Sequence, residues 1–390
     1  MTDSHPARMG HIPEFVTAPS APPIYQTTAF DVPDLDVLAD LHFGRSKGYI
    51  YTRDSNPNHA ALGRSVAMLE GAESGAVFAS GMGAIGAVLM TLAKAGDHII
   101  AARSLYGVTL KLIHRLEQQW NLRVSYVDAC DCQAVAAAVT ESTRLCLIET
   151  ISNPLLEVAD LPAVAAALHG IPLIVDSTFT TPETIRPLEH GAAVVVHSAS
   201  KYLNGHGDVM LGVAAGEKAL IRRIAETASL FGQNANPFES WLTQRGLRTL
   251  PLRMRHVCQT AEQLAQHLQT RPEVSAVYHP SLASHATHAA AQRLYPHGTT
   301  GIVTIRLRGE GREVVNRFMQ AAQSIPFSPT LADSRTTISH PATTSHAFMK
   351  RADREAVGIT DELVRISVGL EPAELLISEI NAALTACVGV

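Results

Sequence analysis

The chain has few cysteines, few aromatic side chains and few charged side chains for its length of 390 residues. Its five cysteines are an odd number, and only Cys130 and Cys132 stand close together, without the second pair that a zinc site needs. Few cysteines without a paired set are typical of proteins in a reducing compartment, so we expect a cytoplasmic protein. No uncharged apolar run reaches about 18 residues, so we expect no membrane span.

A basic excess is absent as well. The formal net charge of −5 argues against a nucleic-acid-binding protein, which would carry a basic stripe. The stretch MTDSHPARMGHIPEF has no apolar core after its charges, so we expect no secretory signal. Eighteen histidines are scattered along the chain, and His285 and His288 come closest to a metal pair. No glutamate accompanies them, so we interpret both as surface residues and predict no metal site.

The rest of the composition, 46% hydrophobic, is that of a well-buried globular protein long enough for two domains. Residues 1–53 hold several prolines and predict an extended arm that contacts a neighbouring subunit, with a strap across its own domain as the alternative. Residues 54–247 alternate apolar strands with helices, which predicts an α/β fold with a mostly parallel sheet covered on both faces. Residues 248–390 predict a smaller α+β domain. The strands of the first sheet are expected at 75–79, 98–102, 123–127, 145–149, 172–176, 194–198 and 209–215.

A lysine follows one of these apolar strands in the sequence HSASKYLNGHGD. The strand delivers Ser198, Ser200 and Lys201 to its carboxyl end, where open α/β sheets bind ligands. Desolvation lowers the pKa of an amine and makes it nucleophilic toward an aldehyde, so Lys201 is a candidate Schiff-base lysine. The alternative is an ordinary solvated charge.

The glycine-rich stretch ASGMGAIG at 79–86 allows three interpretations. It matches the dinucleotide fingerprint, with Arg103 placed to meet a 2′-phosphate. However, about 75 residues precede it, and no acidic residue ends the next strand. The second interpretation is a helix N-terminus whose free N–H groups hold a single phosphate. The third is that the glycines serve tight helix packing.

Three further residues have both a chemical and a structural interpretation. Asp176 ends an apolar strand 25 residues before Lys201, where its carboxylate suits the nitrogen of a pyridinium ring; a helix cap or a buried ion pair is the alternative. Tyr106 follows a strand and is placed either to stack on a planar cofactor or to pack at an interface. Arg365 is a charge inside an apolar strand, which favours a substrate carboxylate or an internal salt bridge.

Together these residues make the chain resemble the Cys/Met-metabolism family of pyridoxal-phosphate (PLP) enzymes. That family includes cystathionine γ-synthase, the cystathionine lyases, methionine γ-lyase and the O-acylhomoserine sulfhydrylases. The similarity runs from about Pro23 to the C-terminus. It is carried by PPIYQTTAF, YTRDSNP, LEGAESGAVFASGMGAI, LYG, ETISNPLLEVADL, VDSTF, HSASKYLNGHGD, RGLRTL and RISVGLE. The resemblance implies a PLP-dependent transferase fold of type I, similar to aspartate aminotransferase, and a homotetramer built as a dimer of catalytic dimers.

The resemblance also implies a role for each matching residue. Lys201 would form the Schiff base with the cofactor, and Tyr106 would stack on its ring and assist proton transfers. The remaining cofactor contacts would be Asp176 at the ring nitrogen, Gly81, Met82, Ser198 and Ser200 at the phosphate, and Tyr51 and Arg53 at the phosphate of the neighbouring subunit. The substrate carboxylate would bind Arg365 and Asn153, with the main chain near Thr330.

The chain departs from the family in ways that affect the expected substrate. Where the family commonly has Glu-Ser-Leu-Gly-Gly, this chain has Pro-Thr-Leu-Ala-Asp at 329–333, so the glutamate of the synthases and cystathionine γ-lyases is missing. Val108 stands where methionine γ-lyases carry a cysteine. Asp54 stands where bacterial synthases tend to have a second arginine. No subfamily signature therefore fits in full.

The predicted function is a PLP-dependent carbon–sulfur lyase of trans-sulfuration chemistry. It would perform α,γ- or α,β-elimination on cystathionine-like or methionine-like amino acids, giving a 2-oxo acid, ammonia and a thiol. One alternative is γ-replacement, as in cystathionine γ-synthase or an O-acylhomoserine sulfhydrylase. The others are an NAD(P)-dependent oxidoreductase built on the glycine-rich stretch, and a PLP-binding protein with little catalytic power.

Overall fold

The computed structural model describes residue 17, residues 19–347 and residues 349–388. Its larger sheet has seven strands in the order β1-β7-β6-β5-β4-β2-β3. The smaller sheet has four strands in the order β10-β11-β9-β8. The strands are β1 (Ser74–Phe78), β2 (His98–Ala102), β3 (Arg123–Val127), β4 (Thr143–Glu149), β5 (Leu173–Asp176), β6 (Val194–Ser198), β7 (Gly212–Gly216), β8 (Val274–Tyr278), β9 (Ile302–Leu307), β10 (Thr337–Ser339) and β11 (Leu363–Ser367).

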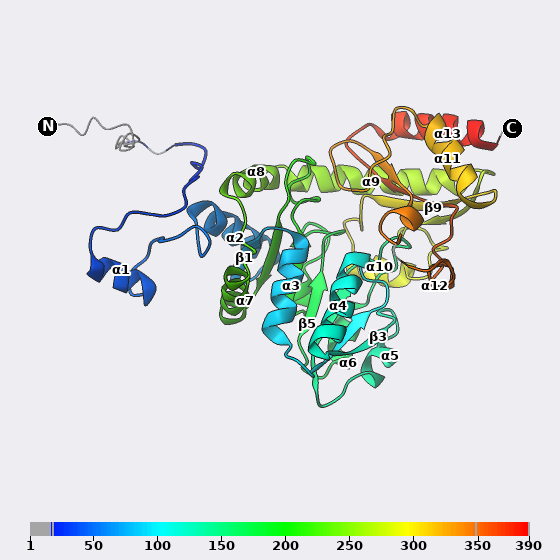
Figure 1. Cartoon of the computed structure of the whole chain (residues 1–390). Helices are drawn as coiled ribbons and strands as arrows, with labels where there is room; N and C mark the ends of the chain where they lie inside the picture. The colour runs from blue at the N-terminus through cyan, green and yellow to red at the C-terminus, as the bar shows by residue number, and fades with distance from the viewer. Residues whose placement is uncertain (1–16, 18, 348, 389–390) are drawn as a thin grey trace.

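Helices cover both sheets, as Figure 1 shows. Helices α3, α4 and α7 belong to the part of the chain around the larger sheet, and the long α9 packs with α13 beside the smaller one. The helices are α1 (Leu35–His42), α2 (Pro57–Glu70), α3 (Gly81–Leu92), α4 (Gly107–Trp120), α5 (Cys132–Ala137), α6 (Leu161–Ala167), α7 (Lys218–Leu230), α8 (Pro237–Leu247), α9 (Leu250–Leu268), α10 (His288–Leu294), α11 (Gly311–Ala321), α12 (Arg351–Ala356) and α13 (Ala373–Val388), with 3₁₀ turns η2 (Pro187–His190) and η3 (Pro341–Thr343).

The larger sheet confirms the expected α/β fold. Strands β3, β2, β4, β5 and β6 pair in parallel, and β7 pairs antiparallel with β6 and β1. All five residues of β2 and the first four of β6 are buried, because helices on both faces keep water from continuously apolar strands. The last strand begins at Gly212, three residues later than predicted. The main-chain groups of Leu211 form hydrogen bonds with Ser200 instead, so Leu211 does not take part in the hydrogen-bond ladder between β6 and β7.

The smaller sheet is antiparallel throughout. Its central strands β9 and β11 bring Arg365 opposite Thr304, so the arginine lies within the most buried part of this sheet.

Helices α7 and α8, and the short α10 and α12, were not predicted from the sequence. Within the described residues, no helix is both long and apolar enough to cross a membrane.

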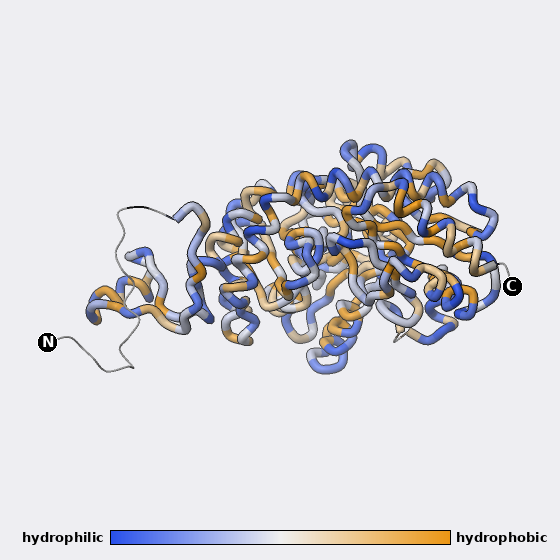
Figure 2. Tube along the Cα trace, turned by 90° about the horizontal axis from the view of Figure 1, so that it is seen from above, coloured by the Kyte–Doolittle hydropathy of each residue, from blue (hydrophilic) through white to orange (hydrophobic). Residues whose placement is uncertain are grey.

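The N-terminal arm is less extended than the sequence predicts. Residues 1–16 lie outside the described part of the chain, and α1 interrupts the remainder. Asp34 caps α1 by accepting the N–H of Val37 at 2.8 Å, a local bond that the proline content of the arm did not reveal. Figures 1 and 2 show α1 standing away from the body of the chain. Its Leu35 is 81% exposed and the following Phe43 is 74% exposed, so this arm leaves apolar surface uncovered.

Candidate active site

Lys201 lies just beyond the carboxyl end of β6, as the sequence predicts, and meets a segment of the C-terminal part of the chain. Its Nζ donates a hydrogen bond to Oγ1 of Thr330 at 2.9 Å. Burial, and then the positive charge of Arg365, lower the pKa of Lys201 to about 8. An amine with this pKa is partly neutral near neutral pH, which is the state that attacks a carbonyl carbon.

Arg365 is held by two oxygen acceptors. It donates from Nη1 to Oδ1 of Asn153 at 3.0 Å and from Nη2 to the carbonyl oxygen of Thr330 at 3.1 Å. Burial lowers its pKa to about 10, so it remains a cation near neutral pH. Within the described chain no carboxylate pairs with Arg365, whose bonds go to an amide and a carbonyl oxygen, and its buried Nε has no acceptor. The internal salt bridge is therefore not found, and the guanidinium has capacity for an added anion.

Asp176 ends β5 with its carboxylate held by the next turn. Its Oδ1 accepts hydrogen bonds from the N–H of Thr178 at 3.0 Å and from the Thr178 hydroxyl at 2.5 Å. The same hydroxyl accepts the N–H of Ser198 at 2.8 Å. Burial raises the pKa of Asp176, while the two bonds from Thr178 lower it. Thr178 thus joins the carboxylate to the strand that leads to Lys201.

Glu149 was missed by the sequence analysis and lies beside Asp176. It ends β4 in direct register with Asp176 on β5, so the two carboxyl groups share one edge of the sheet. Its Oε1 accepts the main-chain N–H of Tyr106 at 2.6 Å. Burial and then the charge of Asp176 raise the pKa of Glu149 well above its ordinary range. An acidic residue at the end of a predicted apolar strand was the available signal.

The glycine-rich stretch opens α3. Ser80 caps the helix by accepting the N–H of Gly83 at 3.0 Å, and the first-turn N–H groups of Gly81 and Met82 have no carbonyl one turn back. A Cβ at Gly81 would stand 2.9 Å from Cβ of Ser198. Tight packing and an available anion site therefore occur together at this helix start.

Two predicted phosphate contacts lie elsewhere in this chain. Tyr51 forms an isolated bridge with Ala29 of the arm, and the guanidinium of Arg53 stacks over the Tyr51 ring. Arg53 also donates to the carbonyl oxygen of Ser229 at 3.4 Å. Among the described hydrogen bonds, neither residue reaches the start of α3. The hydroxyl of Ser200 already has two partners, since it donates to the carbonyl oxygen of Leu211 and accepts the Leu211 N–H.

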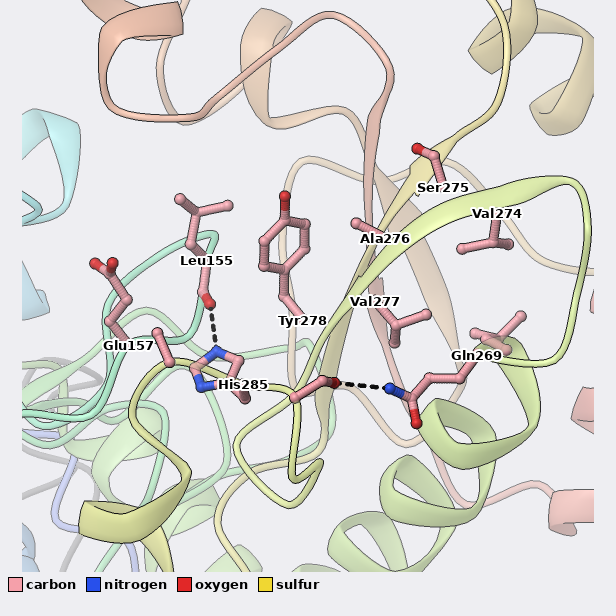
Figure 3. A pocket seen from close by; sticks show the side chains of 12 residues that line it. Leu155, Glu157, Gln269, Val274, Ser275, Ala276, Val277, Tyr278 and His285 are labelled. Carbon is pink, nitrogen blue, oxygen red and sulfur yellow. Dashed lines mark hydrogen bonds between the residues drawn. The ribbon is translucent and has the colours of Figure 1, made fainter.

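A separate concave site lies against the edge strand β8, and its lining includes Leu155 and Glu157 (Figure 3). It has a volume of about 460 Å³, and none of the predicted site residues lines it. His285 contributes to it, and its Nε2–H donates a hydrogen bond to the carbonyl oxygen of Leu155 at 3.0 Å. The expectation that His285 is a surface residue is wrong, because it is only 8% exposed.

Among the described residues, no cluster of His, Cys, Asp or Glu is arranged to hold a metal ion.

Comparisons with known proteins identify the kind of enzyme. A sequence model described as "Cys/Met metabolism PLP-dependent enzyme" matches residues 4–385. The L-methionine gamma-lyase of Pseudomonas putida is 38% identical over 382 residues, covering 97% of this chain and 95% of that protein. The O-succinylhomoserine sulfhydrylase of Pseudomonas aeruginosa is 38% identical over 345 residues, covering 88% and 85%.

Solved structures agree with these relatives. The cystathionine gamma synthase of Xanthomonas oryzae pv. oryzae superposes with a TM-score of 0.89 at 35% identity, covering 95% of this chain and 94% of that one. Fold and similarities together define a PLP-dependent enzyme. More particularly, the chain belongs to the Cys/Met metabolism family, as the sequence predicts.

Proposed function

We propose that this protein is a carbon–sulfur lyase that removes a thiol from a methionine-like or cystathionine-like amino acid. The observation that carries the proposal is the meeting of Lys201, Thr330 and Arg365, which places a low-pKa amine next to a buried cation with spare donor capacity. One water molecule would be consumed, and the products would be a 2-oxo acid, ammonia and the thiol.

The residues at this edge of the sheet fit PLP. The free N–H groups of Gly81 and Met82, with the hydroxyl of Ser198, suit its phosphate. Ser200 would join them when its hydroxyl turns from the carbonyl oxygen of Leu211 to the phosphate. Asp176 suits its ring nitrogen and Tyr106 suits its ring face. When bound, the cofactor supplies an electron sink for the charge left when the α-proton departs.

The chain's own side chains would bind and orient the substrate and transfer its protons. Arg365 and Asn153 would hold the substrate carboxylate and so orient the α-carbon. The Lys201 amine would take the α-proton and return it elsewhere on the substrate, because its pKa of about 8 permits transfer in both directions near neutral pH. The Thr330 hydroxyl would hold that amine in place between transfers.

The segment at 329–333 supports elimination from a substrate without a distal ammonium group. Pro329 offers no carboxylate, and Asp333, the acidic residue of this segment, is already engaged by Arg335 and by the N–H of Ser334. Val108 is an exposed apolar side chain in the first turn of α4. A simple thioether matches such surroundings better than a second charged amino-acid head, since an unmatched charge loses solvation on binding.

The test is a substrate screen on purified enzyme supplied with PLP. L-Methionine, L-cystathionine and O-acylhomoserines would each be incubated with and without a thiol, and the 2-oxo acid, ammonia and thioether would be measured. We expect a 2-oxo acid without added thiol, and none from the Lys201→Ala variant. Production of no 2-oxo acid, ammonia or thioether from any substrate would overturn the proposal.

The second candidate function is γ-replacement. The sulfhydrylase relative has the same 38% identity as the lyase relative, over a somewhat smaller share of the chain. A thioether formed from an O-acylhomoserine only when a thiol is added, with little 2-oxo acid from methionine, would favour this candidate over the lyase.

We also propose a homotetramer built from catalytic dimers. The support is the arm, which leaves Leu35 and Phe43 uncovered, and the contacts of Tyr51 and Arg53, which within the described chain are with Ala29 and Ser229 and not with the start of α3. Sedimentation analysis checks the assembly. Mixing Arg53→Ala chains with Lys201→Ala chains checks the shared site, because a mixed dimer would regain one intact site; no recovery of activity would contradict the sharing.

A further inference from the structure

Three neighbouring strands of the larger sheet end at the edge where the proposed function places the cofactor. Asp176 ends β5, Glu149 ends the adjacent β4, and Tyr106 follows β2 on the other side of β4. Glu149 therefore stands between the residue proposed for the ring nitrogen and the residue proposed for the ring face. The roles proposed for those two outer residues leave the middle one without a function.

Among the described residues, the side chain of Glu149 has one hydrogen bond, and it is to the main chain of Tyr106. The Tyr106 N–H lies 2.6 Å from Oε1 of Glu149. Tyr106 is the N-cap residue of α4, and no side chain caps that helix. The bond to Glu149 thus fixes the main chain at the point from which the phenol side chain projects, while Tyr106 as a whole is 40% exposed.

We propose that Glu149 is a positioning residue that acts through Tyr106. By accepting this N–H, it holds the loop after β2 against the ends of β4 and β5, and so sets the height of the Tyr106 ring over the cofactor. The inference rests on the proposed cofactor role of Tyr106. It does not require the enzyme to be a lyase rather than a γ-replacement enzyme.

The chemistry of the site explains why an acid serves here. Tyr106 N–H needs an acceptor, and a carboxyl oxygen accepts whether the group is ionised or protonated. Burial and Asp176 favour the protonated state of Glu149, as its raised pKa indicates.

The test compares two variants of similar volume. Glu149→Gln keeps an oxygen that accepts the N–H, whereas Glu149→Met removes the acceptor. We expect Glu149→Met to bind PLP about three- to tenfold more weakly and to alter the visible circular dichroism of the bound cofactor. Glu149→Gln should restore both properties to near the wild-type values. Glu157→Gln, a partly buried glutamate outside the site, serves as the matched control.

A double-mutant cycle separates positioning from a general loss of structure. In a Tyr106→Ala background, replacing Glu149 by Met should weaken PLP binding little further, because the ring that it positions is gone. If Glu149→Met fails to fold, as judged by far-ultraviolet circular dichroism, Glu149→Ala takes its place in the cycle.

The outcomes are distinguishable. Additive effects of the two substitutions, or equal losses in the Gln and Met variants, would overturn the positioning role. Unchanged PLP binding in Glu149→Met would do the same. A wild-type protein that binds no PLP at all would instead overturn the proposed function, on which the inference rests.

Discussion

Nζ of Lys201 lies 2.9 Å from Oγ1 of Thr330, a residue 129 positions further along the chain. The bond joins the loop after β6 to the segment before β10, so it links the larger sheet to the smaller one. The main chain of Thr330 also accepts from Arg365 on β11. One threonine therefore contacts both the proposed catalytic amine and the proposed carboxylate-binding guanidinium.

Replacing Lys201 by alanine should abolish turnover. The amine is the proposed proton carrier, and loss of a positioned base typically costs about 10²–10⁴ in rate, to which loss of the covalent link to the cofactor is added. Steady-state assays and the visible absorbance of the protein, before and after borohydride, measure both effects. Lys218→Ala, at an exposed lysine that starts α7, is the control and should leave both unchanged. Full activity in Lys201→Ala would contradict the assignment.

The rate at which the apoenzyme captures PLP should rise with pH through a midpoint of about 8. Capture needs the neutral amine, and burial and then Arg365 lower the pKa of Lys201 to about 8. Arg365→Leu removes a positive charge that disfavours the ammonium, so the pKa rises and the midpoint moves to higher pH. Stopped-flow absorbance at a series of pH values measures the midpoint. A midpoint that stays in place, or moves to lower pH, would argue against this electrostatic coupling.

Gly81→Ala should destabilise the protein and weaken PLP binding. The new Cβ would stand 2.9 Å from Cβ of Ser198, and overpacking of this kind costs about 1–3 kcal/mol. Gly86→Ala in the same helix is the matched control, since its Cβ would meet nothing closer than 3.6 Å. Thermal unfolding and PLP titration should separate the two variants. Equal melting temperatures would show that the helix start adapts to the added carbon.

Glu70 and His197 form a fully buried pair between the end of α2 and β6, with Oε1 and Nε2 2.6 Å apart. Glu70→Ala leaves the imidazole without its carboxylate, so the free energy of unfolding should fall by about 3–5 kcal/mol. The exposed pair Arg222–Glu226 provides the control, and Glu226→Ala should cost less than about 1 kcal/mol. Denaturant titration of both variants measures the difference. Similar small losses in the two would contradict a structural role for the buried pair.

Sequence patterns were sufficient for the strands that carry the site. Three strands, at 98–102, 123–127 and 194–198, were predicted with their observed bounds. The first and last are apolar runs between turn residues, which mark buried parallel strands, whereas the strand at 123–127 lies at the edge of the sheet and is largely unburied. Helix α1 was missed within the proline-rich arm, because an eight-residue helix with no buried side chain leaves only a cap as its signal.

The sequence by itself determined which chemical groups stand at the carboxyl ends of the strands, including Asp176 and Lys201. It determined this because strand direction and the period of two follow from local patterns. Only the tertiary structure decided that Thr330 meets Lys201 and that Glu149 holds Tyr106. Those contacts join residues 129 and 43 positions apart, and they depend on how strands and domains pack, which no local pattern encodes.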